Sequence, residues 1–312
     1  MSLERALELA ERGHGTAHPN PVVGAVLVRD GAVVGEGWHE HAGGPHAEIV
    51  ALEAAGERAR GATLYVTMEP CTHHGRTPPC VDRVVAAGVS RVVAASLDPH
   101  LDAGGGLERL RTAGVDVELV DSFEARRLNE AWRTWIRLRR PFVTYKVAVT
   151  LDGRVAVPGS RWVSGEESRR LVHELRAASD AVAVGMGTVR ADAPLLTARD
   201  VGAARQPRRL AFGRGPLPEG SELELRPGPL DEELAALARE GVQSLLLEGG
   251  PTLATAFLDA DLVDKLLVFV APILGGAGRR FLGDLPASRP LGRLTATAVG
   301  EDLLLSGYVH EP

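Results

Sequence analysis

Three metal-binding side chains lie in separate segments of the sequence, and they constrain the fold more than any other feature. His46, Cys71 and Cys80 offer one imidazole and two thiolates, which is the ligand set of a catalytic zinc that keeps its fourth position open for water. Glu48 lies two residues after His46 and is left free. Because the three segments can act only together, we expect the fold to bring them around one Zn²⁺ per chain.

The same residues indicate a type of reaction. A carboxylate placed like Glu48 can take a proton from zinc-bound water and pass it to a leaving amine, as in zinc deaminases that act on nucleobase rings. The general signature of those enzymes ends in Cys-x-x-Cys, whereas eight residues separate the two cysteines here. Two buried free cysteines, or a structural zinc closed by a fourth ligand, stay open as alternatives. The histidines that could close such a site are His39, His41, His73 and His74.

Length and charge limit the function classes. A chain of 312 residues suggests about two domains, and a net charge of -6 gives no overall footprint for nucleic acid. Both cysteines are claimed by the expected zinc site, which leaves none for a disulfide framework and fits a reducing compartment. The N-terminus lacks the apolar run of a signal peptide, and the longest apolar stretch, 266–274, is too short for a bilayer. We therefore expect a cytoplasmic protein that binds neither nucleic acid nor membranes.

The first half alternates strands with helices, which predicts an α/β layered domain with its chemistry at the strand ends. Asp30-Gly31 between two strand-like runs is a strong hairpin signal. His46 and Cys80 each open an expected helix, and the positive end of a helix favours an ionised thiol. The expected helices are 2–12, 46–58, 80–87 and 107–113, and the expected strands are 22–28, 32–38, 63–67, 91–95 and 115–120.

The segment 121–140 is rich in arginine and has the spacing of one amphipathic helix. A DNA-reading helix would fit this pattern, but Glu124 and Glu130 interrupt the positive charge and favour a connector that packs its apolar side on a domain. We place the domain boundary near Pro141. Beyond it we expect strands at 142–150, 181–184, 207–212, 244–247 and 266–270, helices at 166–178, 230–239 and 252–259, a turn at 185–188 and a loop at 213–229.

Two glycine-rich segments in the second half indicate a nucleotide cofactor. The run 248–252 lies between a strand and a helix start, where backbone N–H groups and the helix dipole favour a phosphate, and 185–188 is a weaker version. Taken alone, each is more often a tight turn. Only two of the 35 basic residues are lysine, and Lys146 stands in the middle of an apolar strand. That position suggests a need for a compact amine, with a solvent-facing side chain as the alternative.

Longer motifs in both halves resemble one enzyme family. His18-Pro-Asn-Pro-x-Val-Gly24, His46-Ala-Glu48 and the run from Glu69 to Cys80 are similar to the pyrimidine deaminase of riboflavin biosynthesis. The runs 141–153, 160–164, 175–181, 187–192, 196–199 and 248–254 follow the order of the reductase half of the bifunctional riboflavin-biosynthesis deaminase/reductase. The resemblance therefore covers nearly the whole chain.

The resemblance implies an α/β protein with an N-terminal cytidine-deaminase-like three-layer domain and a C-terminal dihydrofolate-reductase-like domain. It implies a zinc deaminase over 1–121, a connecting helix over 122–140 and an NADPH-dependent reductase over 141–312. Glu48 is the expected catalytic group. The positions expected to hold substrate are Asn20, His73, Arg76, Ser160, Arg176, Leu196, Arg199 and Glu248. Those expected to surround NADPH are Lys146, Ala148, Trp162, Ser164, Thr188, Asp192, Gly249, Gly250, Pro251, Thr252 and Leu253.

The implied function is a bifunctional enzyme with a small-molecule substrate. It would deaminate 2,5-diamino-6-ribosylamino-4(3H)-pyrimidinone 5′-phosphate and then reduce the ribose of the product to a ribityl chain. Arg176 and Arg199 suit the substrate phosphate, because a guanidinium binds phosphate in a fork. A monofunctional deaminase with a degenerate reductase domain is one alternative. An RNA-editing deaminase with an RNA-binding domain is another, which the acidic charge and the lack of an aromatic stacking motif disfavour. A homo-oligomer is left open.

Overall fold

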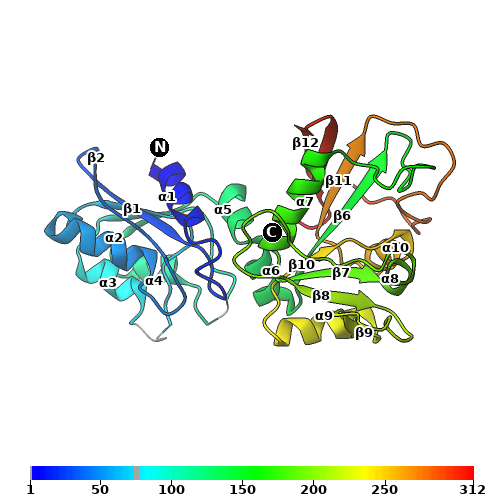
Figure 1. The fold of residues 1–312 in the computed structure, drawn as a ribbon. Helices are drawn as coiled ribbons and strands as arrows, with labels where there is room; N and C mark the ends of the chain where they lie inside the picture. The colour runs from blue at the N-terminus through cyan, green and yellow to red at the C-terminus, as the bar shows by residue number, and fades with distance from the viewer. Residues whose placement is uncertain (1, 74–77, 101) are drawn as a thin grey trace. The chain divides into compact units, whose positions relative to one another are not determined.

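The computed structural model describes residues 2–73, 78–100 and 102–312, and the chain divides into two compact units between Leu138 and Arg139 (Figure 1). The strands and helices predicted for the first 120 residues are confirmed within a few residues of their expected ends. The helices of the first unit are α1 (Ser2–Glu11), α2 (Ala47–Ala55), α3 (Cys80–Ala86), α4 (Gly106–Thr112), α5 (Phe123–Leu128) and α6 (Glu130–Leu138), with a 3-10 helix at Gly56–Ala59. Its strands are β1 (Gly24–Arg29), β2 (Ala32–Trp38), β3 (Thr63–Val66), β4 (Arg91–Ala94) and β5 (Asp116–Leu119).

The strands of the first unit form one sheet in the order β2-β1-β3-β4-β5. β1 pairs antiparallel with β2 and β3, whereas β3, β4 and β5 run parallel. The predicted hairpin joins β1 to β2, and Asp30 and Gly31 have φ values of 50° and 77°, as a two-residue type I′ turn requires. The carboxyl ends of β3 and β4 lie side by side, where the backbone N–H of Glu69 donates to the carbonyl of Ser96 (2.9 Å).

Helices cover both faces of this sheet and make three layers (Figure 1). Successive residues of a strand point to opposite faces, and β1 follows this rule. Leu27 lies in the core with Val84 of α3 and Leu110 of α4, whereas Val26 packs with Leu9 of α1 on the other face. This packing fixes α2 and α3 against the same side of the sheet, so their starts come close to the ends of the parallel strands.

The arginine-rich connector differs from the prediction. The single helix expected over 121–140 is wrong, because α5 and α6 form two helices with Asn129 between them. Asn129 is buried, and its amide donates to the carbonyl of Val22 and accepts from the N–H of Val22, each at 2.8 Å. This pairing joins residues 107 positions apart, which local periodicity does not report. Both helices group with the first unit.

The second unit contains helices α7 (Glu166–Ala178), α8 (Met186–Asp192), α9 (Leu230–Arg239) and α10 (Pro251–Asp259). Its strands are β6 (Phe142–Thr150), β7 (Ala181–Gly185), β8 (Arg208–Phe212), β9 (Glu224–Arg226), β10 (Ser244–Leu247), β11 (Lys265–Ala271), β12 (Gly292–Val299) and β13 (Asp302–Tyr308). Two predictions need correction: the turn at 185–188 contains the first turn of α8, and the loop at 213–229 contains β9. The β12–β13 hairpin was not predicted from the sequence. Short β9 gains its pairing from β8, and the outer strand β12 is largely exposed.

The eight strands of the second unit form one sheet in the order β12-β13-β11-β6-β10-β7-β8-β9. The strands from β11 to β9 in this order are parallel, and the β12–β13 hairpin adds an antiparallel edge. Tyr145 and Val147 of β6 lie in the core with α9 and α10, whereas Ala148 packs against Val172 of α7 on the opposite face. Lys146 shares the face of Ala148 by alternation. No helix in the described ranges has both the length and the apolarity needed to cross a bilayer.

Candidate active sites

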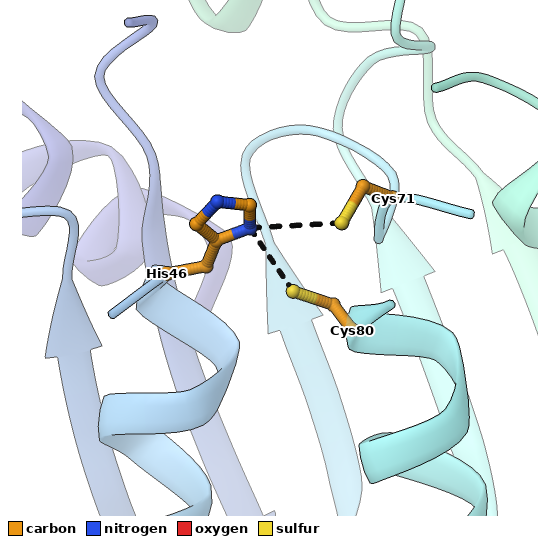
Figure 2. Close-up of side chains that lie close together, drawn as sticks. All are labelled: His46, Cys71 and Cys80. Carbon is orange, nitrogen blue, oxygen red and sulfur yellow. Dashed lines mark hydrogen bonds between the residues drawn. The ribbon is translucent and has the colours of Figure 1, made fainter. Parts of the chain in front are cut away.

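The three expected zinc ligands meet in one cluster. Nδ1 of His46 lies 3.1 Å from Sγ of Cys80 and 3.6 Å from Sγ of Cys71, and the three ligand atoms lie within 4.8 Å of one another. Figure 2 shows the imidazole at the start of α2 facing both sulfurs, one at the start of α3 and one on the loop after β3. Both thiols are buried and form no disulfide.

Local structure explains why these residues converge. His46 is the N-cap of α2, Cys80 is the first residue of α3, and Cys71 follows the end of β3. The backbone N–H of Val81 donates to the carbonyl of Cys71 (3.3 Å). This bond ties the start of α3 to the strand loop, so the long spacing between the cysteines still returns both sulfurs to one point.

The donor set fits a zinc ion with an open position. Within the ranges that the structure describes, no fourth protein ligand joins the cluster. His39 directs its nitrogens at other polar groups, His41 is exposed, and His73 stacks on a second imidazole; His74 lies outside the described residues. A closed structural site is therefore not supported by the described part of the chain, and three ligands plus a free position match a catalytic zinc.

The proton shared between the two thiols also suits a cation site. The Cys80 thiol donates to the Cys71 sulfur, which lowers the pKa of Cys71 and raises the pKa of Cys80. A hydrogen bond to the Cys71 sulfur raises the pKa of His46. Metal binding requires both thiols in the ionised form and releases the proton that remains on the pair, so zinc would take the place of this shared proton.

Glu48 lies in the first turn of α2 and is 3% exposed. Burial raises the pKa of Glu48 to about 7, against the positive charge of His46, and the charge of the nearby Cys71 sulfur also raises it. The group therefore faces the metal cluster without being one of its ligands. A carboxyl group with a pKa near neutrality can both take and return a proton at pH 7, as general acid–base catalysis requires.

The substrate positions expected in the first unit have different surroundings. Nδ2 of Asn20 lies 3.1 Å from Nε2 of His39, and the His39 ring meets the His46 ring edge-on at 5.6 Å between centroids. Asn20 is thus one side chain away from the metal cluster. His73 is exposed and stacks on His100 at 6.4 Å. Arg76 lies outside the described residues.

Three charged groups gather in the second unit near the end of β10: Glu248 follows β10, Lys146 lies within β6 and Arg176 lies on α7. Nε and Nη2 of Arg176 donate to the two carboxylate oxygens of Glu248 at 2.6 and 3.0 Å, and Nζ of Lys146 lies 3.8 Å from Glu248. Burial alone would raise the pKa of Glu248, but the charge of Lys146 and the hydrogen bonds of Arg176 outweigh it and lower that pKa. Burial lowers the pKa of Lys146. The solvent-facing alternative for Lys146 is therefore wrong.

The two arginines expected at the substrate phosphate are not equivalent. The fork of Arg176 is occupied by Glu248, and its Nη1 donates to the carbonyl of Thr197 (3.2 Å). Arg199 is exposed, with Nη1 3.2 Å from the Thr197 hydroxyl and its backbone N–H directed at Nδ1 of His173 (3.2 Å). The guanidinium of Arg199 is the more accessible of the two to a phosphate.

The two glycine-rich segments lie next to each other. Gly185 caps α8 and Gly250 caps α10, and a Cβ built on Gly250 would lie 3.6 Å from Oγ1 of Thr188. A Cβ on Gly249 would lie 2.9 Å from the end of the Leu253 side chain, so a larger residue there would require Leu253 to shift. Pro251 occupies the first turn of α10, where proline is favoured. Thr252 is exposed beside it. Two helix starts with open backbone at one place fit a nucleotide cofactor better than two unrelated turns.

The other residues expected to contact substrate or cofactor lie outside these clusters. Ser160 and Trp162 pair locally in an exposed loop, where the Ser160 hydroxyl donates to the Trp162 carbonyl (2.7 Å). Trp162 is 53% exposed, and the Ser164 carbonyl accepts from Arg169 (2.6 Å). Leu196 has a positive φ of 54° and a core side chain that is 2% exposed, so only its backbone is available to a ligand. Ala148 packs beneath α7, and Asp192 ends α8 in an exposed position.

Sequence reasoning missed three residues around these sites. Glu69 is buried and accepts from the backbone N–H groups of Asp98 (3.0 Å) and Leu107 (3.1 Å), which fixes the loop beside the metal cluster. The sequence suggests His39 only as a spare zinc ligand. His173 precedes Arg176 by one turn of α7, and this i, i+3 spacing was a usable signal that both share one helix face.

Comparison with known proteins finds relatives of both units. Residues 2–96 match the family model of the cytidine and deoxycytidylate deaminase zinc-binding region, and residues 141–218 with 228–305 match the RibD C-terminal domain. The riboflavin biosynthesis protein RibD of Aquifex aeolicus is 42% identical, over 97% of this chain and 96% of its own length. That of Escherichia coli is 42% identical, over 93% of this chain and 92% of its own length.

A solved structure extends the likeness to three dimensions. The diaminohydroxyphosphoribosylaminopyrimidine deaminase/5-amino-6-(5-phosphoribosylamino)uracil reductase of Thermotoga maritima superposes with a TM-score of 0.84 and 34% identity. The match covers 98% of this chain and 97% of the other. Relatives of this identity along nearly the full length define the family, and the two site clusters fall in the two matched regions. The chain belongs to the RibD family of bifunctional riboflavin-biosynthesis deaminase/reductases.

Proposed function

We propose that this chain carries out two consecutive reactions of riboflavin biosynthesis on one small molecule. The first removes the 2-amino group of 2,5-diamino-6-ribosylamino-4(3H)-pyrimidinone 5′-phosphate as ammonia. The second reduces the ribose of that product to a ribityl chain with NADPH, which gives 5-amino-6-ribitylamino-uracil 5′-phosphate. The observation that carries the proposal is that one chain holds a His-Cys-Cys cluster with a free buried glutamate and a separate Lys-Glu-Arg cluster beside two glycine-rich helix starts.

We assign the deaminase to residues 1–121 and the reductase to 141–312, with 122–140 as the connection. In the deaminase, His46, Cys71 and Cys80 would hold zinc, which supplies a Lewis acid that activates water. Glu48 takes a proton from the attacking water and passes it to the ring nitrogen, and it then carries the remaining hydroxyl proton to the leaving amine, which its pKa of about 7 supports. Asn20, His73 and Arg76 would hold the substrate.

In the reductase, the deaminated product is an N-glycosylamine whose ribose ring can open to an imine at C1′. NADPH supplies the hydride for that carbon. We expect Lys146 and Glu248 beside it, where their fixed charges stabilise charge that shifts on the nitrogen and hydroxyls, and the nitrogen takes up one proton from water as the hydride adds. The phosphate would be held by Arg199, with Arg176 behind Glu248, and the sugar by Ser160 and the backbone of Leu196.

The cofactor assignment rests on the paired glycine segments. Gly249, Gly250, Pro251, Thr252 and Leu253 would face NADPH together with Thr188, because both segments end a parallel strand and open a helix. The other proposed cofactor contacts are Lys146, Ala148, Trp162, Ser164 and Asp192. A cytoplasmic location agrees with two zinc-binding thiols, which need a reducing compartment. A homo-oligomer stays a prediction.

The test uses the purified full chain with the diaminopyrimidine phosphate. Ammonia release and NADPH oxidation are followed separately, with and without NADPH. We expect ammonia in both cases and NADPH oxidation only after deamination. Chelator treatment should stop ammonia release, yet the treated chain should still oxidise NADPH when it receives the deaminated intermediate. Ammonia release without any NADPH oxidation would show a monofunctional deaminase. The absence of both ammonia release and NADPH oxidation would refute the proposal.

A further inference from the structure

A buried histidine next to the metal cluster has no role in the reactions described above. His39 is 3% exposed, with Nδ1 3.0 Å from the carbonyl oxygen of Pro45 and Nε2 3.1 Å from Nδ2 of Asn20. We infer that His39 is a positioning residue of the deaminase: it fixes the side-chain amide of Asn20 so that its oxygen faces the pyrimidine as a hydrogen-bond acceptor. This inference rests on the proposed deamination and names a specificity device for it.

The donor and acceptor chemistry of the two contacts determines the orientation. A carbonyl oxygen only accepts hydrogen bonds, so Nδ1 of His39 must carry the proton that points at Pro45. In a neutral imidazole the other nitrogen, Nε2, is then an acceptor. Only the NH₂ end of the Asn20 amide can donate to it, and the amide oxygen must turn the other way.

The backbone around Asn20 is already fixed, which leaves the amide as the variable part. The N–H of Asn20 donates to the carbonyl of Ala17 (2.8 Å). Two residues later, Val22 is held through both its backbone groups by the buried amide of Asn129. With the chain anchored on both sides, the rotation of one side-chain amide is the freedom that His39 removes.

The same histidine connects this amide to the metal ligands. Its partner Pro45 immediately precedes His46, and the His39 ring packs edge-on against the His46 ring at 5.6 Å. Asn20 is half-buried, so its amide is reachable by a bound molecule. A diaminopyrimidine ring presents ring N–H and amino donors, and an acceptor with a fixed direction selects those donors over a carbonyl edge.

The test compares two substitutions of His39 that each keep one of its two contacts. The amide nitrogen of asparagine can take the place of Nδ1, so His39→Asn keeps the hydrogen bond to Pro45 and loses the hydrogen bond to the Asn20 amide. The amide of glutamine reaches as far as Nε2, so His39→Gln keeps an acceptor for Asn20. We expect His39→Asn to raise the deaminase KM about tenfold with kcat nearly unchanged, and His39→Gln to restore KM to within about threefold of wild type.

A double-mutant cycle separates positioning from general support of the fold. If His39 acts only through Asn20, then His39→Asn should have no further effect on KM in an Asn20→Ala background, although it has a clear effect in wild type. Zinc content, melting temperature and reductase turnover on the deaminated intermediate are measured for every variant. These three should stay at wild-type values.

Three outcomes would overturn the inference: an equal KM increase from His39→Asn in both backgrounds, equal damage from the asparagine and glutamine variants, or loss of zinc in either of them. In each of these cases His39 supports the metal segment or the fold rather than the amide. If the wild-type chain releases no ammonia from the diaminopyrimidine phosphate, the proposed function fails together with the inference. If the wild-type chain does release ammonia and one of these three outcomes is found, only the inference fails.

Discussion

Glu48 in the first unit and Glu248 in the second are both buried at their sites, and the two carboxyl groups respond in opposite ways. Glu48 is 3% exposed among an imidazole and two thiols, and burial raises its pKa to about 7. The side chain of Glu248 is 10% exposed, yet the charge of Lys146 and the hydrogen bonds of Arg176 overcome the effect of burial and lower its pKa.

The difference shows that the partners of a buried acid decide its chemistry more than burial does. Glu48 has no guanidinium or ammonium among the groups that shift its pKa, so it can exchange a proton near neutral pH. Glu248 is held as a carboxylate by two cations and acts as a fixed charge that orients Lys146 and Arg176. The predictions below test this contrast by neutralising one acid at a time.

The largest effect should come from Glu48→Gln. A neutral amide keeps the shape of the side chain but cannot carry the proton, so ammonia release should fall about 10²–10⁴-fold. Because no cation is left unpaired, the melting temperature should not fall, and zinc content should stay at one per chain. Reductase turnover of the same variant is the internal control. Ammonia release at the wild-type rate would show that Glu48 is not the proton carrier.

Glu248→Gln should instead cost stability as well as reductase activity. The change leaves Lys146 and Arg176 buried without their carboxylate, and breaking a buried ion pair in this way costs roughly 3–5 kcal/mol. For a unit of this size that lowers the melting temperature on the order of 10 °C, which calorimetry would detect. Ammonia release should persist, since the deaminase lies in the other unit.

A matched control for Glu248→Gln is available on the surface. Glu222 also pairs with an arginine, Arg209, at 2.9 Å, but its side chain is 74% exposed. Glu222→Gln should therefore change stability by less than about 1 kcal/mol. Equal losses from the two variants would mean that the Glu248 cluster is no more important than an ordinary surface pair, and the contrast with Glu48 would disappear.

The two arginines of the reductase allow a finer test. Arg199→Ala should raise KM for the phosphorylated intermediate about tenfold through the loss of one charged hydrogen bond, and should matter little for a dephosphorylated analogue. Arg176→Ala removes a partner of Glu248, so it should lower turnover on both compounds. NADPH affinity, measured by fluorescence, should be nearly unchanged in both variants. If Arg176→Ala affected only the phosphorylated compound, Arg176 would be the residue that binds the phosphate.

Sequence patterns predicted the regular elements well where a single strand or helix carries its own signal. β2, β6, α7, α9 and β10 begin and end at the predicted residues, because apolar alternation, helical spacing and turn residues agree there. The metal ligands were also predictable, since imidazole and thiol groups with a nearby free carboxylate have few other uses. These signals come from neighbouring residues or from side-chain chemistry, so they can be recognised without knowledge of the fold.

The rest depends on contacts between distant residues. Asn129 divides the connector because its amide pairs with Val22, and β9 exists because β8 offers it a partner. The fork of Arg176 is taken by Glu248, 72 residues away, so its availability to a phosphate could not be judged from sequence. His39 is a similar case, because the role inferred for it rests on two hydrogen bonds rather than on any motif.

The smallest effects concern the pH dependence of stability, and their signs should be opposite in the two units. The pKa of Glu248 is lower in the folded chain than its unfolded value of about 4.3. Its contribution to stability is therefore fully present above about pH 4.3 and is lost as pH falls through the folded pKa. The pKa of Glu48 is raised to about 7, so its contribution is fully present below about pH 4.3 and is lost as pH rises through 7.

Calorimetry of the chelator-treated chain can resolve this difference, because metal ligation is itself pH-dependent and would otherwise mask Glu48. Between pH 5 and 8, wild type should lose stability in the first unit relative to Glu48→Gln, since only the wild type must bury a carboxylate as the pH rises. Below pH 5, wild type should lose stability in the second unit more steeply than Glu248→Gln, whose amide has no proton to take up. Parallel pH profiles for wild type and both variants would mean that neither acid is shifted as described. The contrast between a proton carrier and a fixed charge would then have to rest on the kinetic variants alone.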